Sequence, residues 1–352
     1  MKVFDYVKPL TISEAIAAAS EPGSAYLAAG TNLLDLMKAG VTRPDRLVDI
    51  TRLAGLDRIE RLPDGGLRIG AVVRNADLAH DPDFTRSFPA VAEALLSGAS
   101  AQLRNAATVG GNLLQRTRCG YFYDVASACN KRKPGSGCAA RDGENRLHAV
   151  LGWSESCIAT HPSDFCVPLV ALDAVVEIEG RSGRREIAIE ELHRLPGSTP
   201  ELESALEPGD LIVAVRLPGE AADFSSHARY LKLRERTSYA FAVVSAAAAL
   251  DVAAGRIRQA RVALGGVAPK PWRAHAAEEV LAGSVLNEAT FRRAAEAALA
   301  DARPAGNNAF KIELAKRIVS RALALAAAGT PERLPALPAS PFSTAPGAHH
   351  AA

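Results

Sequence analysis

The five cysteines of this 352-residue chain all lie between Cys119 and Cys166, and no other part of the chain contains one. A disulfide scaffold would spread its cysteines through a small secreted domain. Clustering in one segment of a large chain favours a metal site instead. Turn residues such as Pro134-Gly-Ser-Gly137 separate the cysteines. The pattern therefore predicts an irregular, metal-binding loop set into a larger fold.

The spacing of the cysteines bears on the kind of metal. Nine, eight and eighteen residues separate Cys119, Cys129, Cys138 and Cys157, and no close CxxC pair occurs. Structural zinc sites usually use close pairs, which disfavours zinc without excluding it. Four thiolates on separate loop positions can hold a [4Fe–4S] cluster. We predict these four as ligands, with unrelated thiols as the alternative, and Cys166, in an apolar stretch, as a small buried hydrophobe.

Composition excludes several classes of protein. The chain carries 41 basic and 39 acidic residues, without a basic cluster, so we expect no nucleic-acid partner. Its most apolar stretch, Tyr239–Leu250, is shorter than the ~20 residues that a membrane span needs. We expect no membrane insertion. The opening residues lack the apolar run of a signal peptide, although export bound to a signal-bearing partner stays open.

Helix and strand signals alternate along the chain. A Thr11–Glu14 capping box predicts a helix, and a boundary is expected near Pro218. Further helices are expected at 33–39, 89–97, 288–301 and 310–328, a hairpin at 58–70, strands at 25–29, 46–51, 169–179, 185–189, 211–217 and 256–265, and a strand or helix at 239–254. Five prolines in 329–352 rule out a regular helix there and leave a disordered or extended tail.

Two glycine turns could hold a nucleotide from both sides. The second contains Thr108, Gly110, Gly111 and Asn112, and the first consists of Leu27, Ala28, Ala29, Gly30, Thr31, Asn32, Leu33 and Leu34. Glycine turns before a helix let backbone N–H groups approach an anion. Neither turn matches a standard phosphate fingerprint, so plain turns remain the alternative.

Hydrolytic motifs do not occur: no GxSxG or HExxH is present. The polar run His161-Pro-Ser163-Asp164 precedes an apolar stretch and has two interpretations. Ser163 or Asp164 either caps a helix or contributes to a ligand site.

Together these residues resemble the FAD-binding medium subunit of molybdenum hydroxylases, the family of xanthine dehydrogenase and carbon monoxide dehydrogenase, over residues 1–328. Leu27–Leu34 and Asn105–Leu113 are similar to the two flavin loops of that family. Asp164 matches a carboxylate that contacts the flavin polyol in that family. Lys232 matches a lysine that lies near the flavin ring. The runs 263–269 and 271–273 resemble the signature of the family's C-terminal domain.

The chain departs from the common family pattern by an insertion at about 116–160, which contains the four predicted ligands. This insertion resembles that of flavin subunits in periplasmic aldehyde oxidoreductase heterotrimers, which carry a [4Fe–4S] cluster there. A 4-hydroxybenzoyl-CoA reductase-like or xanthine dehydrogenase-like complex is the alternative.

The resemblance implies an α+β fold. A two-lobed FAD-binding domain of the vanillyl-alcohol-oxidase (PCMH) type would comprise lobe 1 (1–57) and lobe 2 (58–222). A small α+β domain of the CO dehydrogenase flavoprotein C-terminal type (224–328) and a Pro-rich tail (329–352) would follow.

The resemblance also implies an electron-transfer role, with no catalytic residue in this chain. A large partner subunit would carry a molybdenum cofactor. A small partner subunit would carry two [2Fe–2S] clusters, which would pass electrons to the FAD of this chain. Thr108 and Asn112 would bind phosphate or ribityl oxygens, Asp164 would accept hydroxyl hydrogen bonds, and Lys232 would place positive charge near the ring. The complex would be periplasmic by co-export, or cytoplasmic. A stand-alone flavin oxidase and a zinc-binding assembly module remain alternatives.

Overall fold

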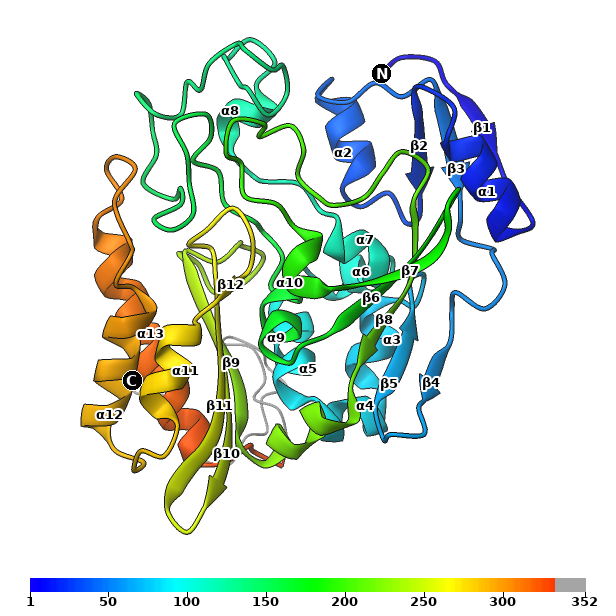
Figure 1. The fold of residues 1–352 in the computed structure, drawn as a ribbon. Coiled ribbons are helices and arrows are strands. Elements are labelled where there is room, and N and C mark those ends of the chain that lie inside the picture. The colour runs from blue at the N-terminus through cyan, green and yellow to red at the C-terminus, as the bar shows by residue number, and fades with distance from the viewer. Residues whose placement is uncertain (333–352) are drawn as a thin grey trace.

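The computed structural model describes residues 1–332, and most of the predicted tail, residues 333–352, lies outside the described part. The first sheet is parallel, in the order β1-β3-β2 (Figure 1). Its elements are β1 (Asp5–Val7), α1 (Ile12–Ala19), β2 (Ser24–Leu27), α2 (Leu33–Lys38) and β3 (Arg46–Asp49). The hydroxyl of Thr11 accepts a hydrogen bond from Glu14 N–H (3.1 Å), so the predicted N-terminal cap of α1 is confirmed.

The second sheet has five antiparallel strands in the order β4-β5-β8-β6-β7. These strands are β4 (Ile59–Arg61), β5 (Leu67–Gly70), β6 (Val175–Gly180), β7 (Gly183–Ala188) and β8 (Leu211–Leu217). Its core is shared with the helices beside it, among which α5 contributes Val91 and α7 contributes Val109, both fully buried. The helices of this region are α3 (Asn75–His80), α4 (Pro82–Ser87), α5 (Pro89–Ser97), α6 (Ala101–Arg104), α7 (Val109–Leu113), α9 (Cys166–Ala171) and α10 (Ile189–Leu192).

The third sheet is antiparallel, in the order β12-β11-β10-β9, and follows the 3-10 segment η1 (Gly219–His227). The helices α11 (His275–Leu281), α12 (Glu288–Ala298) and α13 (Phe310–Ala327) cover one face of it (Figure 1). The strands are β9 (Ala228–Leu233), β10 (Val244–Ala253), β11 (Arg256–Gly265) and β12 (Trp272–Arg273).

Both faces of β10 are buried, which explains why its sequence did not distinguish a strand from a helix. Ala246, Ala248 and Leu250 pack in the core beneath the C-terminal helices, whereas Ala247 and Ala249 join the core of the second sheet. Alternate residues of a strand point to opposite faces. A strand buried on both sides therefore has a continuous apolar sequence without the period of two.

The predicted strand at 169–179 is wrong over its first part and confirmed from Val175 onward. Residues Cys166–Ala171 form the short helix α9, and the strand β6 begins only at Val175. Asp173 lies between them with φ of 52°, a left-handed conformation that ends the helix. Apart from the exposed Asp173, the residues from Cys166 to Val176 are apolar and mostly buried, so their periodicity gave no sign of the change from helix to strand.

The insertion has little regular structure. It contains the single helical turn α8 (Gly120–Tyr123), and between that turn and α9 the described chain forms no further helix or strand. Within residues 1–332, none of the helices is both long enough and apolar enough to cross a membrane. The domain boundaries at residues 57 and 222 stay a prediction.

Candidate functional site

A cavity of about 930 Å³ lies between the three parts of the fold. Six of the predicted cofactor-binding residues line it: Thr31, Asn32, Gly111, Asn112, Asp164 and Lys232. The first two precede α2, the next two belong to α7, and Lys232 lies on β9. A cavity of this size is at the upper end of the range for organic cofactors. The structure thus brings the two glycine loops and the C-terminal domain to one site.

The other predicted residues support this site from outside the cavity lining; they are Leu27, Ala28, Ala29, Gly30, Leu33, Leu34, Thr108 and Gly110. The Thr108 hydroxyl accepts from Gly111 N–H (3.3 Å) as the N-cap of α7. Gly110 N–H donates to Ala71 O (2.8 Å), and a Cβ on Gly110 would lie 3.0 Å from that of Ala71. Their assignment as cofactor-binding residues stays a prediction.

Unpaired polar groups in the first glycine loop fit a phosphorylated ligand. Asn32 Oδ1 accepts from Arg116 N–H (2.8 Å), while its Nδ2 is buried without a partner. Within residues 1–332, the backbone N–H groups of Thr31 and Asn32 also form no hydrogen bond. Buried donors in native proteins are normally satisfied. Free donors at a turn before a helix suit a pyrophosphate, so these residues fit FAD.

Asp164 and Lys232 form a buried ion pair at the cavity wall. Lys232 Nζ donates to Asp164 Oδ2 (2.7 Å) and to Ser97 O (3.1 Å). Tyr230 lies two residues earlier on β9, hence on the same face, and its hydroxyl donates to Asp164 Oδ1 (2.6 Å). Burial and the neighbouring carboxylate raise the pKa of Tyr230. The carboxylate thus balances the charge of the ammonium, whereas the resemblance implied that Lys232 would place positive charge near the ring.

Ser163 accepts a hydrogen bond from the first N–H of α9, as a helix-cap interpretation of the polar run expects, although the N-cap position itself is Phe165. The Ser163 hydroxyl accepts from Cys166 N–H (3.3 Å) and donates to Asn112 Oδ1 (2.8 Å). The contact ties the start of α9 to the second glycine loop. Asp164, the next residue, faces the cavity instead.

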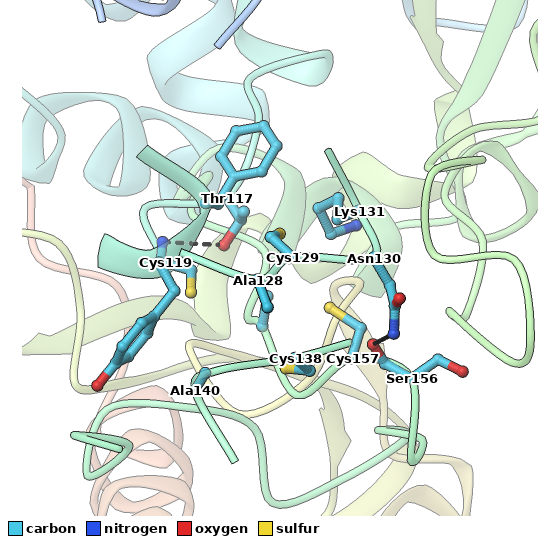
Figure 2. Close-up of a pocket in the computed structure, with 13 residues that line it drawn as sticks. Thr117, Cys119, Ala128, Cys129, Asn130, Lys131, Cys138, Ala140, Ser156 and Cys157 are labelled. Carbon is cyan, nitrogen blue, oxygen red and sulfur yellow. Dashed lines mark hydrogen bonds between the residues drawn. The ribbon is translucent and has the colours of Figure 1, made fainter. Parts of the chain in front are cut away.

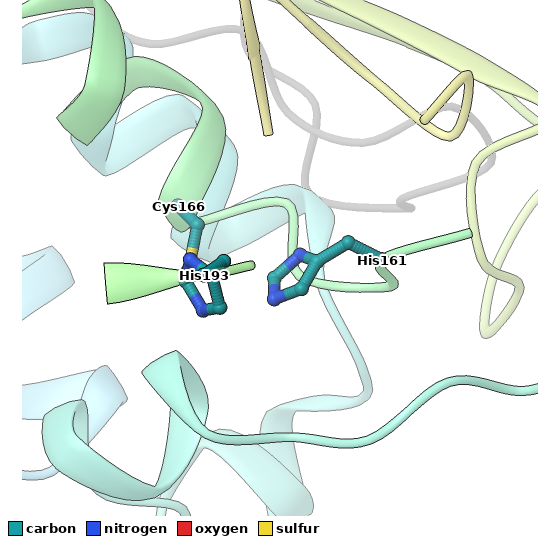
Figure 3. Close-up of side chains that lie close together, drawn as sticks. All are labelled: His161, Cys166 and His193. Carbon is teal, nitrogen blue, oxygen red and sulfur yellow. The ribbon is translucent and has the colours of Figure 1, made fainter. Parts of the chain in front are cut away.

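His161, Cys166 and His193 lie close together beneath this loop (Figure 3). Their potential ligand atoms are all within 4.8 Å of one another. His161 Nδ1, however, accepts from Ser163 N–H (3.3 Å), which leaves the proton of the neutral ring on Nε2. Burial lowers the pKa of both histidines, so both rings are neutral. A protonated Nε2 has no lone pair to offer, and the group does not fit a metal.

The four predicted metal ligands line a second, much smaller cavity, and Cys166 does not (Figure 2). Cys129 and Cys138 face each other in an antiparallel bridge, and Cys157 pairs with Ser154 in a tight turn. Cys119 precedes α8. All five cysteines are free thiols, and Cys166 is fully buried within the core as expected. Residues far apart in the sequence thus meet around one small space.

The surroundings of these thiols fit sulfur atoms that carry negative charge. Backbone N–H groups of Tyr121 and Phe122 face Cys119 Sγ, and Lys131 lies near Cys157. Hydrogen bonds and positive charge around cysteine sulfur are typical of iron–sulfur sites. Burial is the larger effect and, with the neighbouring thiols, raises the pKa of Cys119 to about 11, so the thiolate form needs a bound metal to stabilise it. The donor set fits a metal that displaces the thiol protons.

One histidine of this region was missed by the sequence reasoning. His148 Nε2 lies 3.2 Å from Cys119 Sγ, and the residue lines the larger cavity. Burial, with the nearby charge of Lys311, lowers the pKa of His148 to about 4. Thr117 and Cys119 line both cavities, so the two sites are neighbours. A lone histidine in a loop carries no sequence signal for such a contact.

Comparison with known proteins agrees with this fold and site. Residues 2–220 match the model of the FAD binding domain in molybdopterin dehydrogenase, and residues 229–326 that of the CO dehydrogenase flavoprotein C-terminal domain. The fold and cavity therefore define a flavin-binding subunit of an oxidoreductase. The chain belongs to the family of FAD-binding subunits of xanthine dehydrogenase- and CO dehydrogenase-type molybdenum hydroxylases.

Individual relatives are similar over nearly the whole chain. The aldehyde oxidoreductase FAD-binding subunit PaoB of Escherichia coli (strain K12) is 50% identical over 330 residues, which are 93% of this chain and 99% of the relative. The carbon monoxide dehydrogenase medium chain of Hydrogenophaga pseudoflava is 28% identical over 326 residues, 91% of this chain and 96% of the relative. A solved carbon monoxide dehydrogenase structure from that organism matches with a TM-score of 0.72, at 27% identity, over 92% of this chain and 97% of its own.

Proposed function

We propose that this chain is the FAD-binding, electron-transferring subunit of a molybdenum-dependent aldehyde oxidoreductase. The observation that carries the proposal is the adjacency of the two cavities, which share Cys119 and Thr117. The 50% identity to an aldehyde oxidoreductase subunit supports the substrate class. FAD, when bound, supplies a group that accepts electrons singly and delivers them to an external acceptor.

The chain's own residues would hold and orient this cofactor. Thr31 and Asn32 would bind the pyrophosphate through backbone N–H groups and the free amide. Asn112 would line the ribityl portion, while Ser163 keeps its side chain in place. Asp164 and Lys232 would face the cofactor as a neutral pair, which positions polar groups without adding net charge.

Cys119, Cys129, Cys138 and Cys157 would hold a [4Fe–4S] cluster. Its role is either to relay electrons or to order the insertion. The near-absence of helix and strand in the described insertion supports the ordering role, because a segment without regular secondary structure needs other cross-links to hold one conformation. The adjacency to the larger cavity supports the relay role.

The partners would be a large subunit with the molybdenum cofactor and a small subunit with two [2Fe–2S] clusters. The name of one relative, the carbon monoxide dehydrogenase medium chain, supports a place beside a larger and a smaller subunit. Co-export with a signal-bearing partner would place the complex in the periplasm, with the cytoplasm as the alternative. Fractionation of cells that produce all subunits tests the compartment.

The deciding experiment is anaerobic co-expression with the neighbouring subunits, followed by flavin and iron counts on the separated chain. Flavin with about four irons supports the proposal. Substituting any of the four ligands with serine should remove the iron. Cys166→Ala is the matched control and should retain it, because this thiol lies in the core away from the smaller cavity.

Other outcomes would favour other functions. Flavin without iron would overturn the cluster and leave a plain FAD subunit. A colourless chain that contains zinc would favour an assembly module. Aldehyde or alcohol oxidation by the isolated chain would favour a stand-alone flavin oxidase. Activity of the complex on an aromatic thioester would favour a 4-hydroxybenzoyl-CoA reductase-like complex.

A further inference from the structure

His148 lies where the two cavities meet. Its Nε2 is 3.2 Å from Cys119 Sγ, and the residue lines the larger cavity. The residue is 8% exposed, and its other ring nitrogen, Nδ1, is buried without a hydrogen-bond partner within the described chain. The ring thus contacts a predicted cluster ligand on one side and is unsatisfied on the other.

The C-terminal domain fixes the backbone that carries this ring. Asn308 Nδ2 donates to His148 O (3.1 Å) and Ala149 O (3.0 Å). Lys311 Nζ donates to His148 O (2.9 Å) and Leu147 O (2.8 Å). Both side chains are completely buried at 0% exposure. Four hydrogen bonds on three consecutive carbonyl groups leave the backbone of this loop little freedom. The rest of the fold therefore holds the His148 ring in its contact with Cys119 Sγ.

We propose that His148 donates a hydrogen bond from Nε2 to Cys119 Sγ and thereby raises the reduction potential of the cluster. This inference rests on the proposed [4Fe–4S] site. A metal-bound thiolate carries no proton and can only accept, so the shared proton must reside on Nε2. A donor at sulfur stabilises the added negative charge of the reduced cluster more than the oxidised one. Nδ1, which is buried without a partner in the described chain, is then left as the acceptor nitrogen.

The test is a potentiometric titration of the assembled complex, followed by electron paramagnetic resonance of the reduced cluster. His148→Phe removes the donor and should shift the midpoint potential downward. His148→Gln keeps an N–H donor of similar reach and should retain most of the wild-type value. His275→Phe is the control, since its side chain is 62% exposed on α11, and should leave the potential unchanged.

Each outcome decides a different point. An unchanged midpoint in a His148→Phe complex that retains its iron would overturn the inference. If that variant loses its iron, ¹⁵N-histidine labelling of the wild-type complex decides instead: a nitrogen hyperfine coupling to the reduced cluster supports the hydrogen bond, and its absence overturns it. A wild-type complex without iron would show that the proposed cluster itself is wrong.

Discussion

Lys232 Nζ and Asp164 Oδ2, 2.7 Å apart, join the C-terminal sheet to the start of α9 at the wall of the larger cavity. Their side chains are 3% and 8% exposed. Removing one member of a buried ion pair leaves the other charge uncompensated, which typically costs about 3 kcal/mol or more. We therefore expect Lys232→Met to lower the free energy of unfolding by about 3 kcal/mol, measured by denaturation of the purified complex.

The matched control for this variant is Lys2→Met. Lys2 pairs with Asp45 as well, but both side chains are at least half exposed. Exposed ion pairs contribute at most about 1 kcal/mol. Equal destabilisation by the two substitutions would contradict the buried pair as a link between the domains.

Substitution of Asn32 by aspartate tests the first glycine loop without changing the shape of the side chain. Asn32→Asp keeps the acceptor for Arg116 N–H but replaces the unpartnered Nδ2 with a charged oxygen. Against a pyrophosphate, this change loses a donor and adds repulsion, so we expect FAD to bind at least about tenfold more weakly, or 1.4 kcal/mol. Fluorescence titration of the deflavinated complex measures the change.

Asn287→Asp provides the control for that measurement. Asn287 caps α12 by accepting from Thr290 N–H (2.8 Å), and aspartate caps equally well. FAD affinity should stay at the wild-type value in this variant. Unaltered affinity in Asn32→Asp would remove the first glycine loop from the cofactor site.

The parts of the fold with strong local signals were predictable from the sequence. The helix at 89–97 and the strands at 211–217 and 256–265 have the expected bounds. Proline at the first turn and alternating or β-branched residues produce such signals locally. The strand predicted from residue 169 failed over 169–171, because burial of α9 on all sides removes the periodicity on which a prediction depends.

In the candidate site, too, the residues with a local sequence signal could be predicted, and those that depend on distant contacts could not. The cysteine cluster and the glycine turns stand out by residue type, and the structure brings each set together. His148 and Lys311 could not be foreseen. The contact of His148 with Cys119 spans 29 residues of irregular chain, and Lys311 bonds to carbonyl groups more than 160 residues away. Likewise, the pairing of Lys232 with Asp164 depends on how β9 packs on α5, which no local pattern encodes.

Loss of the metal should loosen the insertion selectively. Between α8 and α9 the described chain has neither helix nor strand, and the four cysteines meet around the smaller cavity, so a bound metal would cross-link the segment 119–157. We expect Cys138→Ser to expose Lys131 and Arg132 to trypsin, with cleavage several-fold faster than in the wild-type complex. Mass spectrometry of the fragments locates the cut. Cys166→Ala should remain resistant, and equal resistance of both variants would mean that the insertion is ordered without metal.

Lys311 should make stability depend on pH. Burial lowers the pKa of Lys311 from 10.5 to about 7. Between about pH 7 and pH 10.5 the Lys311 amine is therefore neutral in the folded chain and protonated in the unfolded chain. Stability therefore rises with pH across this window, by up to about 1.4 kcal/mol per pH unit. Denaturation of the complex at pH 7 and pH 9 should show this rise. Lys311→Met should reduce it, and an identical slope in both proteins would mean that the ammonium stays charged among its three carbonyl acceptors.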